Sequence, residues 1–140
     1  LGMRVEGTDT TRGTLNTDGY HQVARQIVEE FSIQQVAITL RESLSASKNG
    51  WSAALYDGPS KSFHISQRYE INLVDRIGAG DSFVAGLIFA SVAGRNHEET
   101  LRFAVAASVL KQTIPGDFNR VSVAEVERLA GGDTSGRVQR

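Results

Sequence analysis

A glycine-rich junction in the second half of the chain constrains the fold most. Leu73-Val74-Asp75 has the character of a strand end, Gly78-Ala79-Gly80-Asp81 that of a tight turn, and the run from Phe83 to Ala93 that of an apolar helix. Glycine permits positive φ and close approach, so successive N–H groups can converge on an anion. The helix that follows adds free amides and partial positive charge at its N-terminus. This order predicts an α/β protein with a site for a phosphate or a developing phosphoryl charge.

Hydrophobic periodicity along the first part of the chain agrees with α/β layering. A helix is expected from Asp18, its predicted cap, because apolar side chains recur at helical spacing; they are Val23, Ile27, Val28 and Phe31. The short apolar run 36–40 predicts a strand buried on both faces of a parallel sheet. Residues 1–17 show no steady period and are interpreted as a loop.

The middle of the chain is rich in strand signals and its end in helix signals. The turn signal Lys48-Asn49-Gly50 predicts a hairpin before a strand at 51–56, and further strands are expected at 62–65 and 69–74. Helices are expected at 81–93, which is apolar nearly all round and therefore buried, and at 98–112. A short last helix is expected from Ser122, which has capping-box spacing to Glu125.

The composition of the chain limits the kinds of partner that it is expected to bind. The 140 residues are 40% hydrophobic, which is enough for one globular core. The 15 basic and 16 acidic residues nearly cancel, so no broad attraction for nucleic acid or an anionic membrane is expected. The absence of cysteine excludes disulfides and thiolate metal sites and fits a reducing cytoplasm. The longest apolar run is shorter than the roughly 20 residues of a membrane span. We therefore expect a cytoplasmic protein with a small-molecule partner.

Asp81, near the start of the apolar helix, is a candidate catalytic residue. Its carboxylate would repel a phosphate, so it is better suited to orient a hydroxyl group and accept its proton during phosphoryl transfer. The alternative is a tight turn with an aspartate helix cap. No Gly-Lys-Ser/Thr follows, as a Walker A loop requires, and the third glycine of the dinucleotide fingerprint is missing.

The longer string around this turn resembles the second signature of the ribokinase-like (PfkB-type) carbohydrate kinases. That signature is Asp, two residues, Gly-Ala-Gly-Asp, one residue, Phe, two residues, Gly; the matching positions are Asp75, Gly78, Ala79, Gly80, Asp81, Phe83 and Gly86. Arg76-Ile77 and the segments 38–43 and 113–119 are most similar to 2-keto-3-deoxygluconate kinases. The resemblance implies the C-terminal part of a three-layer α/β/α fold with a mainly parallel sheet.

The same resemblance implies an activity and a domain organisation. Residues 1–130 would be the C-terminal ATP-binding and catalytic portion, and residues 131–140 a disordered tail. The reaction would be ATP-dependent phosphorylation of a sugar or sugar acid hydroxyl, converting 2-keto-3-deoxygluconate to its 6-phosphate. Asp81 would be the catalytic base, and the amides of Gly78, Ala79 and Gly80 would form the anion hole for the transferred phosphoryl group.

Further site residues follow from the resemblance, each with a structural alternative. Thr39 and Arg41 occupy the end of the nucleotide-side strand, where Arg41 would pair with ATP phosphates or be a surface arginine. Three positions would border adenine or belong to the core; they are Val105, Ala106 and Ser108. Asp117 would contact the sugar acid or form a turn. Asp75 would lie near a monovalent-cation site for K⁺ or accept hydrogen bonds from nearby amides. The three histidines are expected to be solvated or structural.

Kinases of this family are much longer than this chain. The chain starts with Leu1 rather than methionine, so we expect it to begin partway through a gene product. The half that supplies most sugar contacts and an Asn-x-x-Glu-like motif tied to Mg²⁺ has no counterpart here. The alternative function is therefore a non-catalytic nucleotide-binding or assembly module. An uncovered apolar sheet edge would favour a homo-oligomer in which another copy covers it.

Overall fold

The computed structural model describes residues 16–132, and the chain divides into two compact units, Leu1–Glu70 and Ile71–Arg140. The predicted N-terminal loop lies outside the described residues except for Asn16 and Thr17. The predicted disordered tail lies outside them except for Gly131 and Gly132. No helix of the described part is long and apolar enough to cross a membrane.

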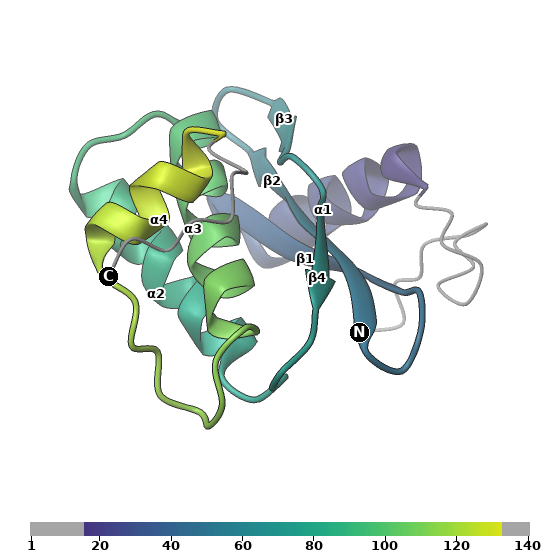
Figure 1. Cartoon of the computed structure of the whole chain (residues 1–140). Helices are drawn as coiled ribbons and strands as arrows, with labels where there is room; N and C mark the ends of the chain where they lie inside the picture. The colour runs from purple at the N-terminus through teal and green to yellow at the C-terminus, as the bar shows by residue number, and fades with distance from the viewer. Residues whose placement is uncertain (1–15, 133–140) are drawn as a thin grey trace. The chain divides into compact units, whose positions relative to one another are not determined.

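The first unit packs one helix on an antiparallel sheet. Helix α1 (Thr17–Phe31) contacts strands β1 (Gln35–Ser43) and β2 (Lys48–Asp57), and β2 also pairs with β3 (Ser62–Ile65), as Figure 1 shows. The cap of α1 is Asn16, whose side chain accepts a hydrogen bond from Gly19 N at 3.0 Å. Asp18 lies in the first turn instead. The helix was therefore predicted correctly, but its predicted cap was wrong by two residues.

The strand pairs β1–β2 and β2–β3 are antiparallel, which differs from the mainly parallel sheet expected from the sequence. The reason is the connection between β1 and β2, which is only residues 44–47. Parallel neighbours need a crossover of about a dozen residues or more. Strand β1 is also not buried on both faces, because Leu40 and Glu42 are buried whereas Thr39 and Arg41 are exposed.

The predicted hairpin exists, but its turn lies at residues 44–47 and not at the predicted residues 48–50. Asn49 and Gly50 lie inside β2 and are buried, with Gly50 directly opposite Glu42 on β1. A Cβ at Gly50 would stand 2.7 Å from Nη2 of Arg68. The glycine therefore gives the Arg68 guanidinium room to lie against the strand, and this packing need, rather than a turn, explains its place in the sequence.

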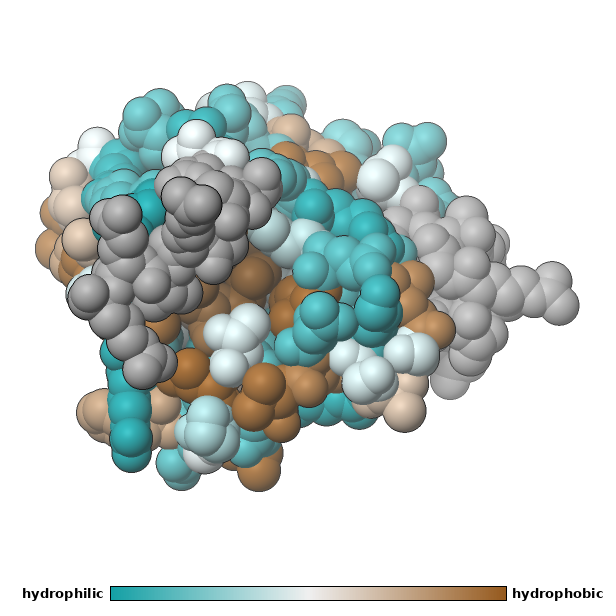
Figure 2. Space-filling view, in the orientation of Figure 1, coloured by the Kyte–Doolittle hydropathy of each residue, from teal (hydrophilic) through white to brown (hydrophobic). Residues whose placement is uncertain are grey.

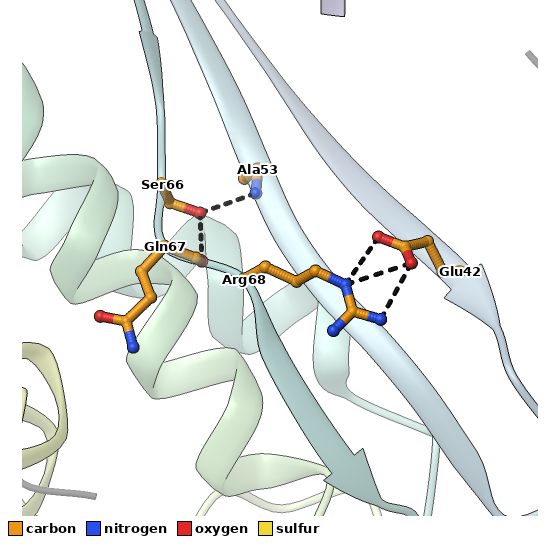
Figure 3. Close-up of polar contacts among 5 residues, drawn as sticks. All are labelled: Glu42, Ala53, Ser66, Gln67 and Arg68. Atoms are coloured by element: carbon orange, nitrogen blue, oxygen red, sulfur yellow. Dashed lines mark hydrogen bonds and ion pairs between the residues drawn. The ribbon is translucent and has the colours of Figure 1, made fainter. Parts of the chain in front are cut away.

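The guanidinium of Arg68 forms a bidentate ion pair with the buried carboxylate of Glu42, as Figure 3 shows. Nε donates to Oε1 at 2.9 Å and Nη2 to Oε2 at 3.0 Å. The Glu42 side chain is 6% exposed and that of Arg68 42%. Next to the pair, Ser66 Oγ accepts a hydrogen bond from Ala53 N at 3.0 Å. These contacts tie the segment after β3 to both long strands.

Replacing Arg68 with methionine is expected to lower the free energy of unfolding by about 1–3 kcal/mol, because the buried Glu42 carboxylate loses its partner. Arg25→Met is the matched control, since Arg25 and Glu29 form an exposed pair on α1. That control should cost less than about 0.5 kcal/mol. Urea denaturation followed by circular dichroism measures both, and equal losses would show that the burial of Glu42 has no special effect.

The second unit is a layer of three helices. Strand β4 (Tyr69–Asn72) leads into it, and α3 (His97–Lys111) packs against α2 (Ala79–Val92) and α4 (Val123–Ala130), as Figure 1 shows. A Cβ at Gly86 on α2 would stand 3.0 Å from Cα of Ala104, so the two helix backbones approach closely. Helix α4 begins with the predicted capping box of Ser122 and Glu125, which is confirmed.

The composition of helix α2 predicts burial on all sides, but this prediction is wrong. It buries one face and leaves Val84, Ile88 and Val92 between 52% and 84% exposed. Figure 2 shows hydrophobic residues, in brown, on the surface among hydrophilic residues, in teal. The apolar character of a segment predicts that it can be buried, but burial also requires neighbours, and α3 covers one face only.

Candidate active site

The turn before α2 requires glycine at its first position. Gly78 is the N-cap of α2 and has a left-handed backbone, with φ of 76°. A Cβ there would stand 2.3 Å from the carbonyl oxygen of Asp117, far inside van der Waals contact. Any side chain at position 78 would therefore be strained by its own backbone and would collide with the 114–119 loop.

The first turn of α2 is left without a side-chain cap. The side chains of Asn16, Asn96 and Ser122 cap α1, α3 and α4, whereas α2 has no such hydrogen bond. Asp81 therefore does not cap the helix, and the cap alternative is wrong. A Cβ at Gly80 would meet no atom within 4 Å, so the space beside Gly80 is open. Ala79 N donates only a long bond of 3.4 Å to Arg76 O, and N-terminal helix amides without a side-chain cap can donate to an anion.

The 114–119 loop is fastened to the glycine turn on both sides. Gly116 N donates to Oδ2 of Asp75 at 3.0 Å, and Asn119 Nδ2 donates to Oγ of Ser82 at 2.6 Å. These bonds join the loop to the residues before and after Gly78-Ala79-Gly80-Asp81. Asp117 is thereby held at the same end of the second unit as Asp81.

The predicted residues Gly78, Asp81 and Asp117 line one cleft of about 330 Å³. The rest of its lining comes from α2, α3, the loop and α4, and is largely apolar; it includes Ala85, Phe89, Phe103, Ala107, Val121, Val123 and Val126. Phe89 and Phe103 stack with ring centroids 5.2 Å apart. Asp81 is exposed. The cleft thus presents two carboxylates beside an uncapped helix N-terminus, which suits a ligand with hydroxyl and anionic groups.

Asp75 uses both carboxylate oxygens to hold the turn. Oδ1 accepts from Ile77 N at 3.0 Å and Oδ2 from Gly116 N at 3.0 Å. The bond from Ile77 lowers the pKa of Asp75 below its ordinary value, and the bond from Gly116 and the charge of Lys111 act in the same direction. These contacts match the structural alternative for Asp75, and the cation role stays a prediction.

Asp75→Asn is expected to destabilise the chain at pH 7, and this destabilisation should shrink as the pH falls below about 4. A carboxyl whose pKa is lower in the folded state stabilises the fold above its unfolded pKa, and loses that contribution as the pH falls through the folded value. Urea unfolding at several pH values measures the difference between variant and parent. A constant difference across that range would contradict the ionic role of Asp75.

The three residues predicted to border adenine are core residues of α3. Val105, Ala106 and Ser108 are each 0% exposed, and none lines the cleft. Ser108 has a role that its position in a helical pattern did not reveal, because its Oγ donates to Ala79 O at 2.8 Å. This buried bond fixes the glycine turn from behind. Contact of these residues with adenine stays a prediction.

Thr39 and Arg41 belong to the first unit, where both are exposed on β1. With the Asn49 amide oriented to satisfy its neighbours, its oxygen accepts a hydrogen bond from Arg41 Nε at 3.1 Å. Arg41 therefore has a side-chain partner within the first unit, and its pairing with ATP phosphates stays a prediction.

Two residues near the turn were missed by sequence reasoning. Asn119 was read only as part of a similar segment, and Lys111 as the end of a helix; Lys111 is in fact 0% exposed. No signal in the sequence indicated its burial, because a basic residue is favoured in the last turn of any helix. No group of three or more His, Asp or Glu in the described part is placed to hold a metal ion. His21 is structural, since it stacks on Phe63 at 4.6 Å.

Comparison with known proteins identifies the family of this chain. The model of the pfkB family carbohydrate kinases matches residues 16–120. The 2-dehydro-3-deoxygalactonokinase of Haloferax volcanii is 32% identical over 124 residues, which are 87% of this chain and 36% of that protein. The crystal structure of 2-dehydro-3-deoxygluconokinase from Thermotoga maritima is 44% identical with a TM-score of 0.80, covering 87% of this chain and 36% of that one.

A PfkB family carbohydrate kinase from Listeria grayi is also similar, with 28% identity, a TM-score of 0.72, and coverage of 84% of this chain and 36% of that one. The chain therefore spans about a third of the length of these relatives, and it has their α/β fold over the part that it covers. The family match extends from the first residue of the described part through the glycine turn and the 114–119 loop. The chain belongs to the pfkB family of carbohydrate kinases.

Proposed function

We propose that this chain supplies the phosphoryl-transfer part of an ATP-dependent sugar-acid kinase, with 2-keto-3-deoxygluconate as the acceptor. The observation that carries the proposal is the uncapped N-terminus of α2, with open space at Gly80 and the carboxylate of Asp81 beside it. Relatives named 2-dehydro-3-deoxygluconokinase and 2-dehydro-3-deoxygalactonokinase support the class of acceptor.

The chemistry divides between the backbone and one side chain. The amides of Gly78, Ala79 and Gly80 stabilise the negative charge that develops on the transferred phosphoryl group. Asp81 orients the sugar hydroxyl and takes its proton as the new P–O bond forms and the bond to the leaving ADP breaks. Asp117, which lines the same cleft, holds a hydroxyl of the sugar acid. Arg41 pairs with the phosphates of ATP.

The test is ATP titration by calorimetry, followed by an assay of phosphate transfer to 2-keto-3-deoxygluconate. The proposal predicts saturable ATP binding, and transfer once the residues of a complete kinase are present. Failure of ATP to bind would contradict it. Galactonate- and gluconate-derived acceptors should be compared, because the two named relatives differ in this respect.

The second candidate function is a non-catalytic nucleotide-binding or assembly module. ATP binding without transfer by the purified chain would support this function, and transfer by the chain alone would exclude it.

A further inference from the structure

Lys111 is a buried charge next to the candidate active site. It is the last residue of α3 and is 0% exposed, although lysine is almost never fully buried without a partner. Among the described residues it forms no ion pair, and Nζ donates only a long hydrogen bond of 3.4 Å to Ile114 O. Removing an ammonium group from water is costly, so a role for the charge must be sought nearby.

The side chain of Lys111 reaches the glycine turn from the protein interior. Its Cε lies 3.2 Å from the point that a Cβ of Gly78 would occupy. Its charge also acts on Asp75, which holds the same turn through Ile77 and Gly116. The ammonium group is thus placed on the inner side of the turn whose outer side is open at Gly80.

We propose that Lys111 is a positioning residue of the phosphoryl-transfer site: its buried ammonium group keeps positive charge beside the Gly78-Ala79-Gly80 turn and strengthens the binding of the transferred phosphoryl group. The inference rests on the proposed function. Lys111 does not touch the ligand, since it is fully buried. It acts through the turn, because a fixed charge in a medium of low dielectric constant acts over a longer range than it would in water.

The test uses the full chain and inorganic phosphate as the probe. Phosphate is titrated into isotopically labelled protein, and the backbone amide shifts of Gly78, Ala79 and Gly80 give the dissociation constant. Lys111→Met removes the charge, and we expect it to weaken phosphate binding about tenfold. Lys111→Arg keeps the charge and should bind phosphate within about threefold of the parent.

Gln112→Met is the matched control. Gln112 is 1% exposed at the same helix end, and its Nε2 donates to Ser108 O at 3.3 Å, but it carries no charge. A merely structural role for Lys111 predicts similar affinity in both methionine variants. If Lys111→Met does not fold, Lys111→Gln, which keeps a donor for Ile114, replaces it.

The outcomes separate this inference from the proposed function. If the parent binds phosphate at the turn and the uncharged Lys111 variants bind it equally well, the role of Lys111 is wrong while the anion hole stands. If phosphate does not shift these amides in the parent, the anion hole fails and the inference fails with it. A tenfold loss in Lys111→Met, with Gln112→Met unchanged, supports both.

Discussion

Asp81→Asn is expected to reduce the rate of phosphate transfer by about 10²–10⁴-fold in the protein that carries out the reaction. Asparagine has nearly the same shape as aspartate, but its amide cannot accept the proton of the sugar hydroxyl. Asp81 makes no cap to α2, so its replacement leaves the helix start intact. ATP affinity should therefore stay within about twofold of the parent, because the amides of the turn are unchanged.

Asp117→Asn is the matched control for Asp81, since both carboxylates line the same cleft. Asp117 is proposed to bind the sugar acid and not to take a proton. Its variant should mainly raise KM for the acceptor, whereas Asp81→Asn should mainly lower kcat. Near-normal turnover of Asp81→Asn would contradict its role as the base.

Gly78→Ala is expected to lower the free energy of unfolding by about 2–6 kcal/mol. Two effects add: alanine is strained at a φ of 76°, and its Cβ would stand 2.3 Å from the Asp117 carbonyl oxygen. Since domains are typically stable by only about 5–15 kcal/mol, this variant can be largely unfolded. Thermal and urea denaturation measure the loss.

Gly80→Ala is the control for Gly78, because a Cβ at Gly80 meets no atom within 4 Å. Gly80 lies inside α2, where alanine is favoured over glycine by about 1 kcal/mol. This variant should be as stable as the parent or slightly more stable. Similar losses in the two glycine variants would show that the contact with Asp117 does not hold the turn.

The strand-turn-helix order around the site could be predicted because its signals are local. The glycines, the apolar helix after them and the capping box at Ser122 act over a few residues, and each is found where expected. The shared cleft of Asp81 and Asp117 depends instead on the bond between Asn119 and Ser82, which are 37 residues apart. No periodicity in the sequence reports such a bond.

The errors in the first unit also have a physical cause. An apolar run such as 36–40 indicates a strand but not the direction of its neighbour, which the short 44–47 connection determines. Asn49-Gly50 is a frequent turn pair, but Gly50 is needed here for the guanidinium of Arg68, which comes from a segment 18 residues later. Burial of Lys111 was equally hidden, because it depends on the loop that follows α3.

The most direct measurement of the central claim follows the backbone amides of the turn while ADP and aluminium fluoride, a mimic of the transferred phosphoryl group, are added. We expect the largest shifts at Gly78, Ala79 and Gly80, and their loss in Gly80→Val, whose side chain would occupy the open space beside Gly80. Shifts confined to other parts of the chain, or equal shifts in Gly80→Val, would contradict an anion hole at Gly78-Ala79-Gly80-Asp81.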